Sequence, residues 1–89
     1  MKAIVTVIGK DKVGITASVC SLLAQHNINI LDITQTVLQD YFTMIMMVDT
    51  SGCSLAFKDL AELLRSRGES RELVIRIQRE DIFNAMHRI

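Results

Sequence analysis

The hydrophobic pattern of this chain changes its period at one short segment, the loop from Gly9 to Ile15. Before the loop, residues 3–8 (Ala-Ile-Val-Thr-Val-Ile) are rich in β-branched side chains, which predicts a strand. After the loop, apolar residues recur at the spacing of one helical face. They are Ile15, Val19, Leu22 and Leu23. A strand therefore gives way to a helix within one short turn, which restricts the chain to folds built from β–α units.

Two further strands are predicted in succession after this helix. The helix is expected to end at Asn27, because asparagine tolerates the left-handed conformation found at helix C-termini. A second strand starts at Ile28, and its alternation slips near Leu31-Asp32, which indicates a bulge. A tight turn at Gln39-Asp40 leads into a third strand over residues 41–48.

The last part of the chain predicts a helix, a strand and a final helix. Ser54 is the expected cap of the second helix, and Gly68 is expected to close it. A fourth strand is predicted over 72–78, and residues 80–89 predict a short C-terminal helix.

This order of elements indicates an α+β fold of the ferredoxin-like βαββαβ kind. Such a fold is a four-stranded antiparallel sheet with two helices on one face, here followed by the C-terminal helix. We expect a single domain over residues 1–89, with the βαββαβ core at 2–79. The first and third strands are apolar on both faces, whereas the helices cover one face only. The uncovered apolar surface predicts a homodimer or larger assembly.

The composition narrows the class of function. Ten basic and ten acidic residues give a formal net charge of zero, which argues against a nucleic-acid-binding protein and favours self-association. No apolar stretch approaches the roughly 20 residues that span a bilayer, and Met1-Lys2 leads directly into a strand without a signal-peptide pattern. We therefore expect a cytoplasmic protein without a membrane partner. Cys20 and Cys53 have no metal-ligand spacing and are expected to be reduced and mostly buried.

The loop itself fits neither common phosphate motif. A dinucleotide fingerprint needs a further glycine between Gly9 and Gly14, and a P-loop needs Lys-Ser or Lys-Thr where Ile15 follows Gly14. Asp11 could be a turn residue and Gly14 a tight packing position. Alternatively, glycines and an aspartate at a strand-to-helix turn suit a small ligand, because the helix start offers free N–H donors to an anion. The residues alone leave both readings open.

The loop and the sequence Asn27-Ile28-Asn29-Ile30 after the first helix together resemble an ACT domain. ACT domains are small amino-acid-sensing regulatory modules with the same βαββαβ order, and the resemblance covers about residues 2–79. The ending, residues 80–89, resembles a bacterial group of stand-alone ACT proteins of uncharacterised function that lack an attached enzyme.

The resemblance implies a ligand site between the first loop of one subunit and the second strand of its neighbour. Asp11 would be the polar contact of the loop, and Val13 belongs to the same segment. Gly14 and Ile15 would present backbone N–H groups to an amino-acid carboxylate, and Asn29 matches a ligand-contacting position. Two departures bear on ligand identity: Val13 stands where proline commonly precedes the glycine, and Gly9 stands where some members carry a polar side chain.

Three functions follow in order of preference. The first is a non-enzymatic regulatory homodimer that binds an amino-acid-like metabolite and is read by an unidentified regulated protein, without a metal or cofactor. The second is a dimerisation or protein-interaction module with an empty site. The third, an enzyme of the acylphosphatase kind, shares the fold, but Asp11 would place an anion where its phosphate has to bind.

Overall fold

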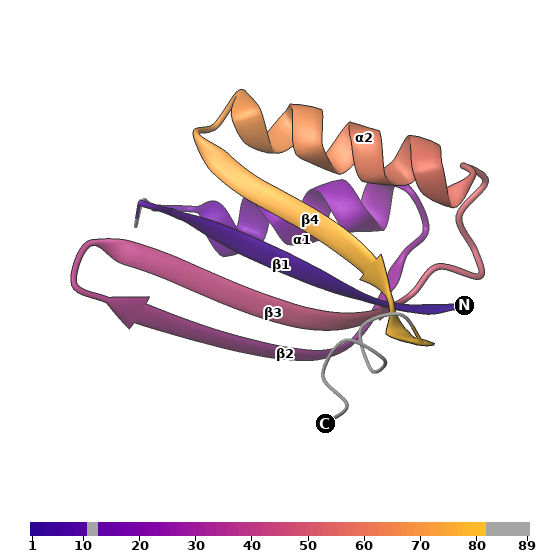
Figure 1. Cartoon of the computed structure of the whole chain (residues 1–89), viewed down its shortest axis with the longest axis horizontal. Coiled ribbons are helices and arrows are strands. Elements are labelled where there is room, and N and C mark those ends of the chain that lie inside the picture. The colour runs from indigo at the N-terminus through magenta and orange to yellow at the C-terminus, as the bar shows by residue number, and fades with distance from the viewer. Residues whose placement is uncertain (11–12, 82–89) are drawn as a thin grey trace.

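The computed structural model describes residues 1–10 and 13–81. The described elements follow the order β1 (Lys2–Lys10), α1 (Ile15–Gln25), β2 (Asn29–Leu38), β3 (Tyr41–Asp49), α2 (Phe57–Glu69) and β4 (Leu73–Arg79). They confirm the predicted βαββαβ order (Figure 1). Most of the predicted C-terminal helix falls on residues 82–89, outside the described residues.

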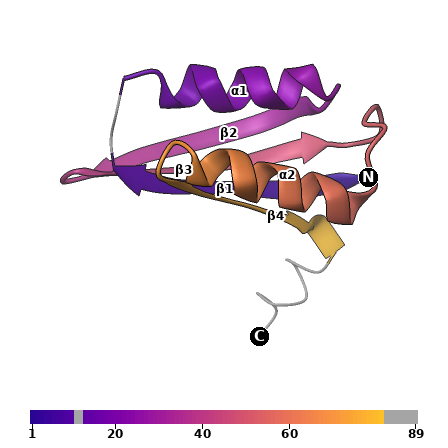
Figure 2. The same ribbon diagram turned by 90° about the horizontal axis from the view of Figure 1, so that it is seen from above.

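The four strands form one antiparallel sheet in the order β2-β3-β1-β4. The central strands β1 and β3 are paired along their whole length, from Lys2 with Asp49 to Lys10 with Tyr41. The helices run alongside the sheet, with α2 next to β4 (Figure 2). β2 and β4 are therefore the two edge strands.

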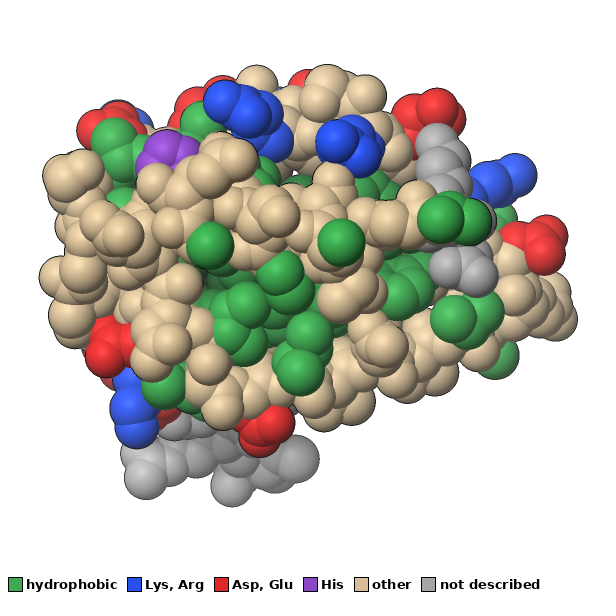
Figure 3. Space-filling view, turned by 180° about the vertical axis from the view of Figure 1, so that it is seen from behind, with side chains coloured by type: hydrophobic (Ala, Val, Ile, Leu, Met, Phe, Trp, Pro, Cys, Tyr) green, Lys and Arg blue, Asp and Glu red, His purple; other side chains and the backbone are tan. Residues whose placement is uncertain are grey.

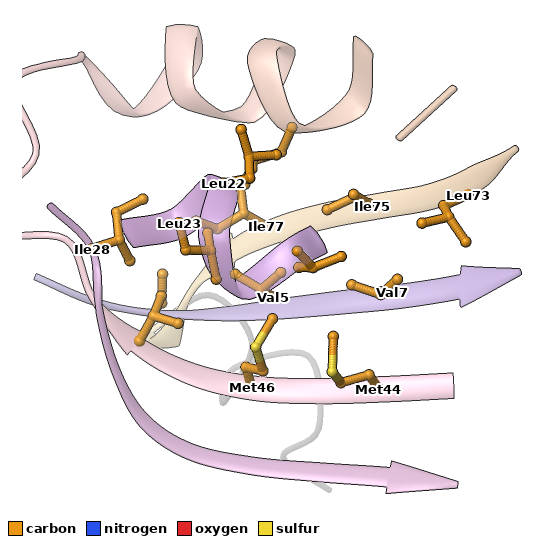
Figure 4. Packing of buried hydrophobic residues seen from close by; sticks show 14 of the residues in the cluster. Val5, Val7, Leu22, Leu23, Ile28, Met44, Met46, Leu73, Ile75 and Ile77 are labelled. Carbon is orange, nitrogen blue, oxygen red and sulfur yellow. The ribbon is translucent and has the colours of Figure 1, made fainter. Parts of the chain in front are cut away.

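The core lies between the helices and one face of the sheet (Figure 4). Alternate residues of β1, β3 and β4 point into it, as their period of two requires. Their partners on the helices include Leu23, Leu60 and Leu64, which are at most 1% exposed. The strand residues of the core are Ala3, Val5, Val7, Phe42, Met44, Met46, Val48, Leu73, Ile75 and Ile77. Phe42, Met44 and Met46 of β3 are thus packing residues of the core.

Asn27 ends α1 in the predicted way. Its φ of 58° is left-handed, and its N–H donates to the carbonyl of Ala24 at 3.1 Å. The N–H of Ile28 donates to the carbonyl of Leu23 at 3.0 Å, and the side chains of Ile28 and Leu23 are buried. This pair of hydrogen bonds is a Schellman motif, which satisfies the last carbonyls of the helix and turns the chain toward β2.

The predicted slip in β2 is also confirmed. Ile30 pairs with Val48, but Asp32 pairs with the next residue, Met47, so that Leu31 is an extra residue in the strand. The bulge reverses the alternation of β2. Beyond it, Ile33 pairs with the core residue Met46 and lies on the helix side of the sheet.

Two predictions about the ends of α2 were wrong. The helix begins at Phe57 with Ala56 at the N-cap and no side-chain cap, so Ser54 does not cap it. Gly68 does not terminate the helix, because α2 continues to Glu69 and Gly68 is buried within its last turn. A Cβ at Gly68 would lie 2.8 Å from the carbonyl oxygen of Leu73 and 2.9 Å from Cγ1 of Ile75. The glycine is required because the helix approaches the backbone of β4.

This close approach predicts the effect of Gly68→Ala. In an open helix the substitution would stabilise by about 1 kcal/mol through helix propensity. Here we expect it to lower the free energy of unfolding by about 1–3 kcal/mol, because the carbonyl of Leu73 is backbone and cannot move aside cheaply. Urea unfolding measures the difference, with Ser66→Ala on the exposed side of α2 as the control. An increase in stability for Gly68→Ala would contradict this packing.

Candidate functional site

The loop that opens the candidate site leads directly into α1. Gly14 is the N-cap residue, with φ 86° and ψ 7°, a left-handed conformation that glycine adopts without a steric penalty. Val13 is fully exposed, whereas Ile15 is 6% exposed and anchors the helix in the core. Asp11 lies outside the described residues.

The first turn of α1 presents backbone hydrogen-bond donors. Among the described residues no side chain caps the helix, and the carbonyl of Gly14 accepts the N–H of Ser18 at 2.9 Å. The N–H groups before Ser18 at the helix start have no intrahelical carbonyl to bond and carry the positive end of the helix dipole. Apart from its two chain neighbours, no described residue has a heavy atom within 4 Å of the position that a Cβ of Gly14 would take. A small carboxylate can therefore approach these donors from solvent.

Asn29 lies at the other end of α1 from Gly14. It begins β2, pairs with Asp49 and is exposed. The 11 residues of α1 separate the two positions by about 16 Å along the helix. Asn29 also alternates with Ile30, which packs against the core, so it belongs to the side of the sheet away from the helices. One chain thus does not bring Asn29 to the loop.

The opposite end of β2 lies near the loop instead. Leu38, the last residue of β2, pairs with Tyr41, and Tyr41 pairs with Lys10 at the end of β1. The loop therefore leaves the sheet at the end where β2 finishes.

A hydrogen bond that the sequence did not reveal joins the loop side of α1 to β2. Thr16 Oγ1, in the first turn of α1, donates to Gln35 Oε1 at 3.0 Å. Gln35 pairs with the core residue Met44, which places it on the helix side of β2. Its carboxamide NH2 group has no partner among the described residues and can donate to a ligand at the helix start. The two residues are far apart in sequence, so no local pattern signals their contact.

β2 carries the most exposed apolar row of the sheet. Every residue from Leu31 to Leu38 is exposed, including Ile33 at 41% and Val37 at 53%. Val37 pairs with the core residue Phe42, and Ile33 pairs with the core residue Met46. Val37 and Ile33 therefore both lie on the helix side of the sheet. Figure 3 shows hydrophobic side chains gathered in a band across the middle of the molecule seen from behind. The helices leave this part of the sheet uncovered.

The sheet face away from the helices is more mixed than the sequence suggested. Ile8, Ile45 and Val74 are exposed there. Ile45 is flanked in register by Thr6 and Thr34 on the neighbouring strands, and β4 adds Arg76. Exposed apolar side chains are therefore found both along β2 on the helix side and, among polar residues, on the opposite face.

Other side-chain chemistry in the described residues is structural or dispersed. Ser51 donates to the Asp49 carboxylate from its hydroxyl at 2.6 Å and from its N–H at 3.0 Å, and these bonds lower the pKa of Asp49 to about 2. Cys20 and Cys53 are free thiols and half-buried. Residues 1–10 and 13–81 contain no group of three or more metal-ligating side chains. Among the same residues, no helix has the length and apolarity to cross a membrane.

Comparison with known proteins agrees with this architecture. The ACT domain family model matches residues 2–78. A UPF0237 protein of Clostridium acetobutylicum is 54% identical over 89 residues, which is the full length of both chains. Among solved structures, an ACT domain protein from Streptococcus pneumoniae is 43% identical, covers 93% of each chain and superposes with a TM-score of 0.84.

A more distant similarity shows how the same fold occurs inside a larger protein. A formyltetrahydrofolate deformylase from Pseudomonas syringae is 22% identical with a TM-score of 0.79, over 88% of this chain and 27% of the deformylase. At that identity the likeness concerns the fold alone. The family match over residues 2–78 and the full-length relatives lead to one conclusion: this chain belongs to the ACT domain family, a family of regulatory ligand-binding domains.

Proposed function

We propose that this protein is a non-enzymatic regulatory domain that pairs with a second copy through β2 and binds an amino-acid-like metabolite at the interface. The exposed apolar row on β2, an edge strand, is the observation that carries the proposal. An edge strand with unpaired backbone groups and apolar side chains is a template for pairing with another chain. A zero net charge adds no long-range repulsion between copies.

The two sheet edges differ in their capacity for self-pairing. The middle of β4 is Arg76, so antiparallel pairing of two β4 strands would set Arg76 opposite the same arginine of the second copy. The middle of β2 is Ile33-Thr34, and Asp32 is its single charged residue. β2 therefore favours a two-fold contact, and β4 opposes one.

Two-fold pairing of β2 would also complete the candidate site. Strands related by a two-fold axis are antiparallel, so full overlap of β2 sets Asn29 of one subunit opposite Leu38 of the partner subunit. Leu38 marks the end of the sheet from which the loop to Gly14 leaves. The arrangement brings Asn29 to the end of the partner's sheet from which the loop to Gly14 leaves, which a single chain cannot do. It also covers Ile33 and Val37 of both subunits.

The groups at this junction complement a zwitterion of amino-acid size. The free N–H groups after Gly14 suit a carboxylate, and the carboxamide NH2 of Gln35 adds a donor beside them. The Asp11 carboxylate and the amide oxygen of Asn29 would accept from the ammonium group. Because these groups come from two subunits, the ligand would stabilise the assembly to which it binds. A regulated protein would respond to that change by binding one state of assembly in preference to the other.

The proposed β2 interface predicts a dimer in solution. The wild-type protein should sediment as a dimer at micromolar concentration. Ile33→Lys should weaken dimerisation at least tenfold, since pairing would bury an unpaired ammonium group. Ile45→Lys is the matched control, because Ile45 is exposed to a similar degree on the opposite face of the sheet. Sedimentation velocity measures both. A monomeric wild-type protein, or a control variant that dissociates while Ile33→Lys stays dimeric, would contradict the β2 interface.

The proposed site predicts that an amino-acid-like ligand stabilises the protein. In a thermal-shift screen of the twenty amino acids and related metabolites, at least one should raise the melting temperature. A ligand at 100 times its Kd adds about 2.7 kcal/mol to the stability of the folded state. Asn29→Ala and Asp11→Ala should each weaken that ligand at least tenfold, whereas Ser21→Ala on the exposed side of α1 should not.

The same screen separates the proposal from its alternative. If the protein is a dimerisation or interaction module without a ligand, no metabolite stabilises it at millimolar concentration. In that case Asp11→Ala also leaves dimerisation unchanged. The dimer prediction would then stand and the ligand proposal would fail.

A further inference from the structure

A hollow lies between the two helices, on the side of α1 that faces away from β2. Its volume is about 230 Å³. Ser18 and Gln25 line it from α1, and Arg67, Ser70 and Arg71 line it from the end of α2 and the turn that follows. We propose that this hollow binds a small phosphate monoester, held by Arg67 and Arg71. The inference is independent of the proposed amino-acid site.

The charge of this hollow is unbalanced, although the protein as a whole is neutral. None of the described residues that line it is acidic, and α1 contains no charged residue at all. Within the described part of the chain, neither Arg67 nor Arg71 has an ion pair or a side-chain hydrogen bond. By contrast, Arg65 on the same helix is held by Glu62 and Glu69. Two uncompensated guanidinium groups beside one concavity attract an anion.

The turn after α2 fixes the second arginine beside the first. The N–H of Arg71 donates to the carbonyl of Gly68 at 2.9 Å, and the N–H of Glu72 donates to the carbonyl of Glu69 at 3.1 Å. The left-handed φ of 60° at Glu72 then turns the chain into β4. The helix dipole accounts for a basic residue in the last turn, which is the place of Arg67, but Arg71 lies beyond the helix end. Its position is set by the backbone of the turn.

The remaining lining groups favour a phosphate ester. Guanidinium groups match phosphate oxygens with paired N–H donors, and two of them balance a dianion. The Ser18 hydroxyl and the Gln25 carboxamide have no side-chain partner among the described residues and can donate to further oxygens. Ser70 Oγ already donates to the carbonyl of Arg67 at 2.8 Å. Val19, Leu22 and Leu73 form an apolar floor that suits the carbon portion of a small ester.

NMR titration of the full-length protein tests this site. Inorganic phosphate, methyl phosphate and succinate are added separately at constant ionic strength, and the backbone amides of Ser18, Gln25 and Arg71 are followed. We expect saturable shifts with methyl phosphate at low millimolar concentration, phosphate binding no more tightly than the ester, and succinate at least fivefold more weakly. The amide of Gly14 should not shift, which separates this site from the amino-acid site.

Matched arginine variants decide which groups bind. Arg67→Gln and Arg71→Gln should each weaken methyl phosphate at least tenfold. Arg71→Lys, which keeps the charge but loses the paired donors, should weaken it less. Arg65→Gln on the same helix is the control and should leave the affinity unchanged. The site is refuted by non-saturable shifts up to about 50 mM, by equal weakening in Arg65→Gln, or by succinate that binds as tightly as the ester.

Discussion

The packing of two helices against a four-stranded sheet is the constraint on which the rest of this structure depends. Alternate residues of β1, β3 and β4 are buried beneath α1 and α2, and the helices are not wide enough to cover β2 as well. β2 keeps the same alternation beyond its bulge, so Ile33 and Val37 lie on the helix side but remain exposed. The surface that we assign to a second subunit is thus a direct consequence of how the core is built.

Much of the fold could be predicted because its determinants are local. The change of period around Gly14, the left-handed end of α1 at Asn27 and the slip at Leu31 each depend on a few neighbouring residues. The two errors at α2 have the opposite origin. Gly68 was read as a helix terminator, but its role is set by the carbonyl of Leu73, which tertiary packing brings within 2.8 Å of where its Cβ would be. Composition cannot distinguish a terminating glycine from one required by close approach.

The candidate site was predictable in its parts but not in its assembly. The sequence identified the glycine that opens α1 and the asparagine after it, yet α1 itself keeps Gly14 and Asn29 apart. The Thr16–Gln35 hydrogen bond and the hollow with Arg67 and Arg71 depend on contacts between elements that are distant in the sequence. No local sequence pattern could therefore predict them. The separation of Gly14 from Asn29 is informative, because it makes a shared site depend on a second copy.

Disulfide trapping between two differently labelled copies tests the proposed assembly most directly. One copy carries Asn29→Cys and the other Leu38→Cys, both with Cys20 and Cys53 replaced by serine. Antiparallel pairing of β2 predicts a mixed disulfide between positions 29 and 38 under mild oxidation, because opposed residues of adjacent strands have Cα atoms about 4.5–5.5 Å apart. Cross-linking of Asn29→Cys only to itself, or no cross-link at protein concentrations where the dimer forms, would contradict the account.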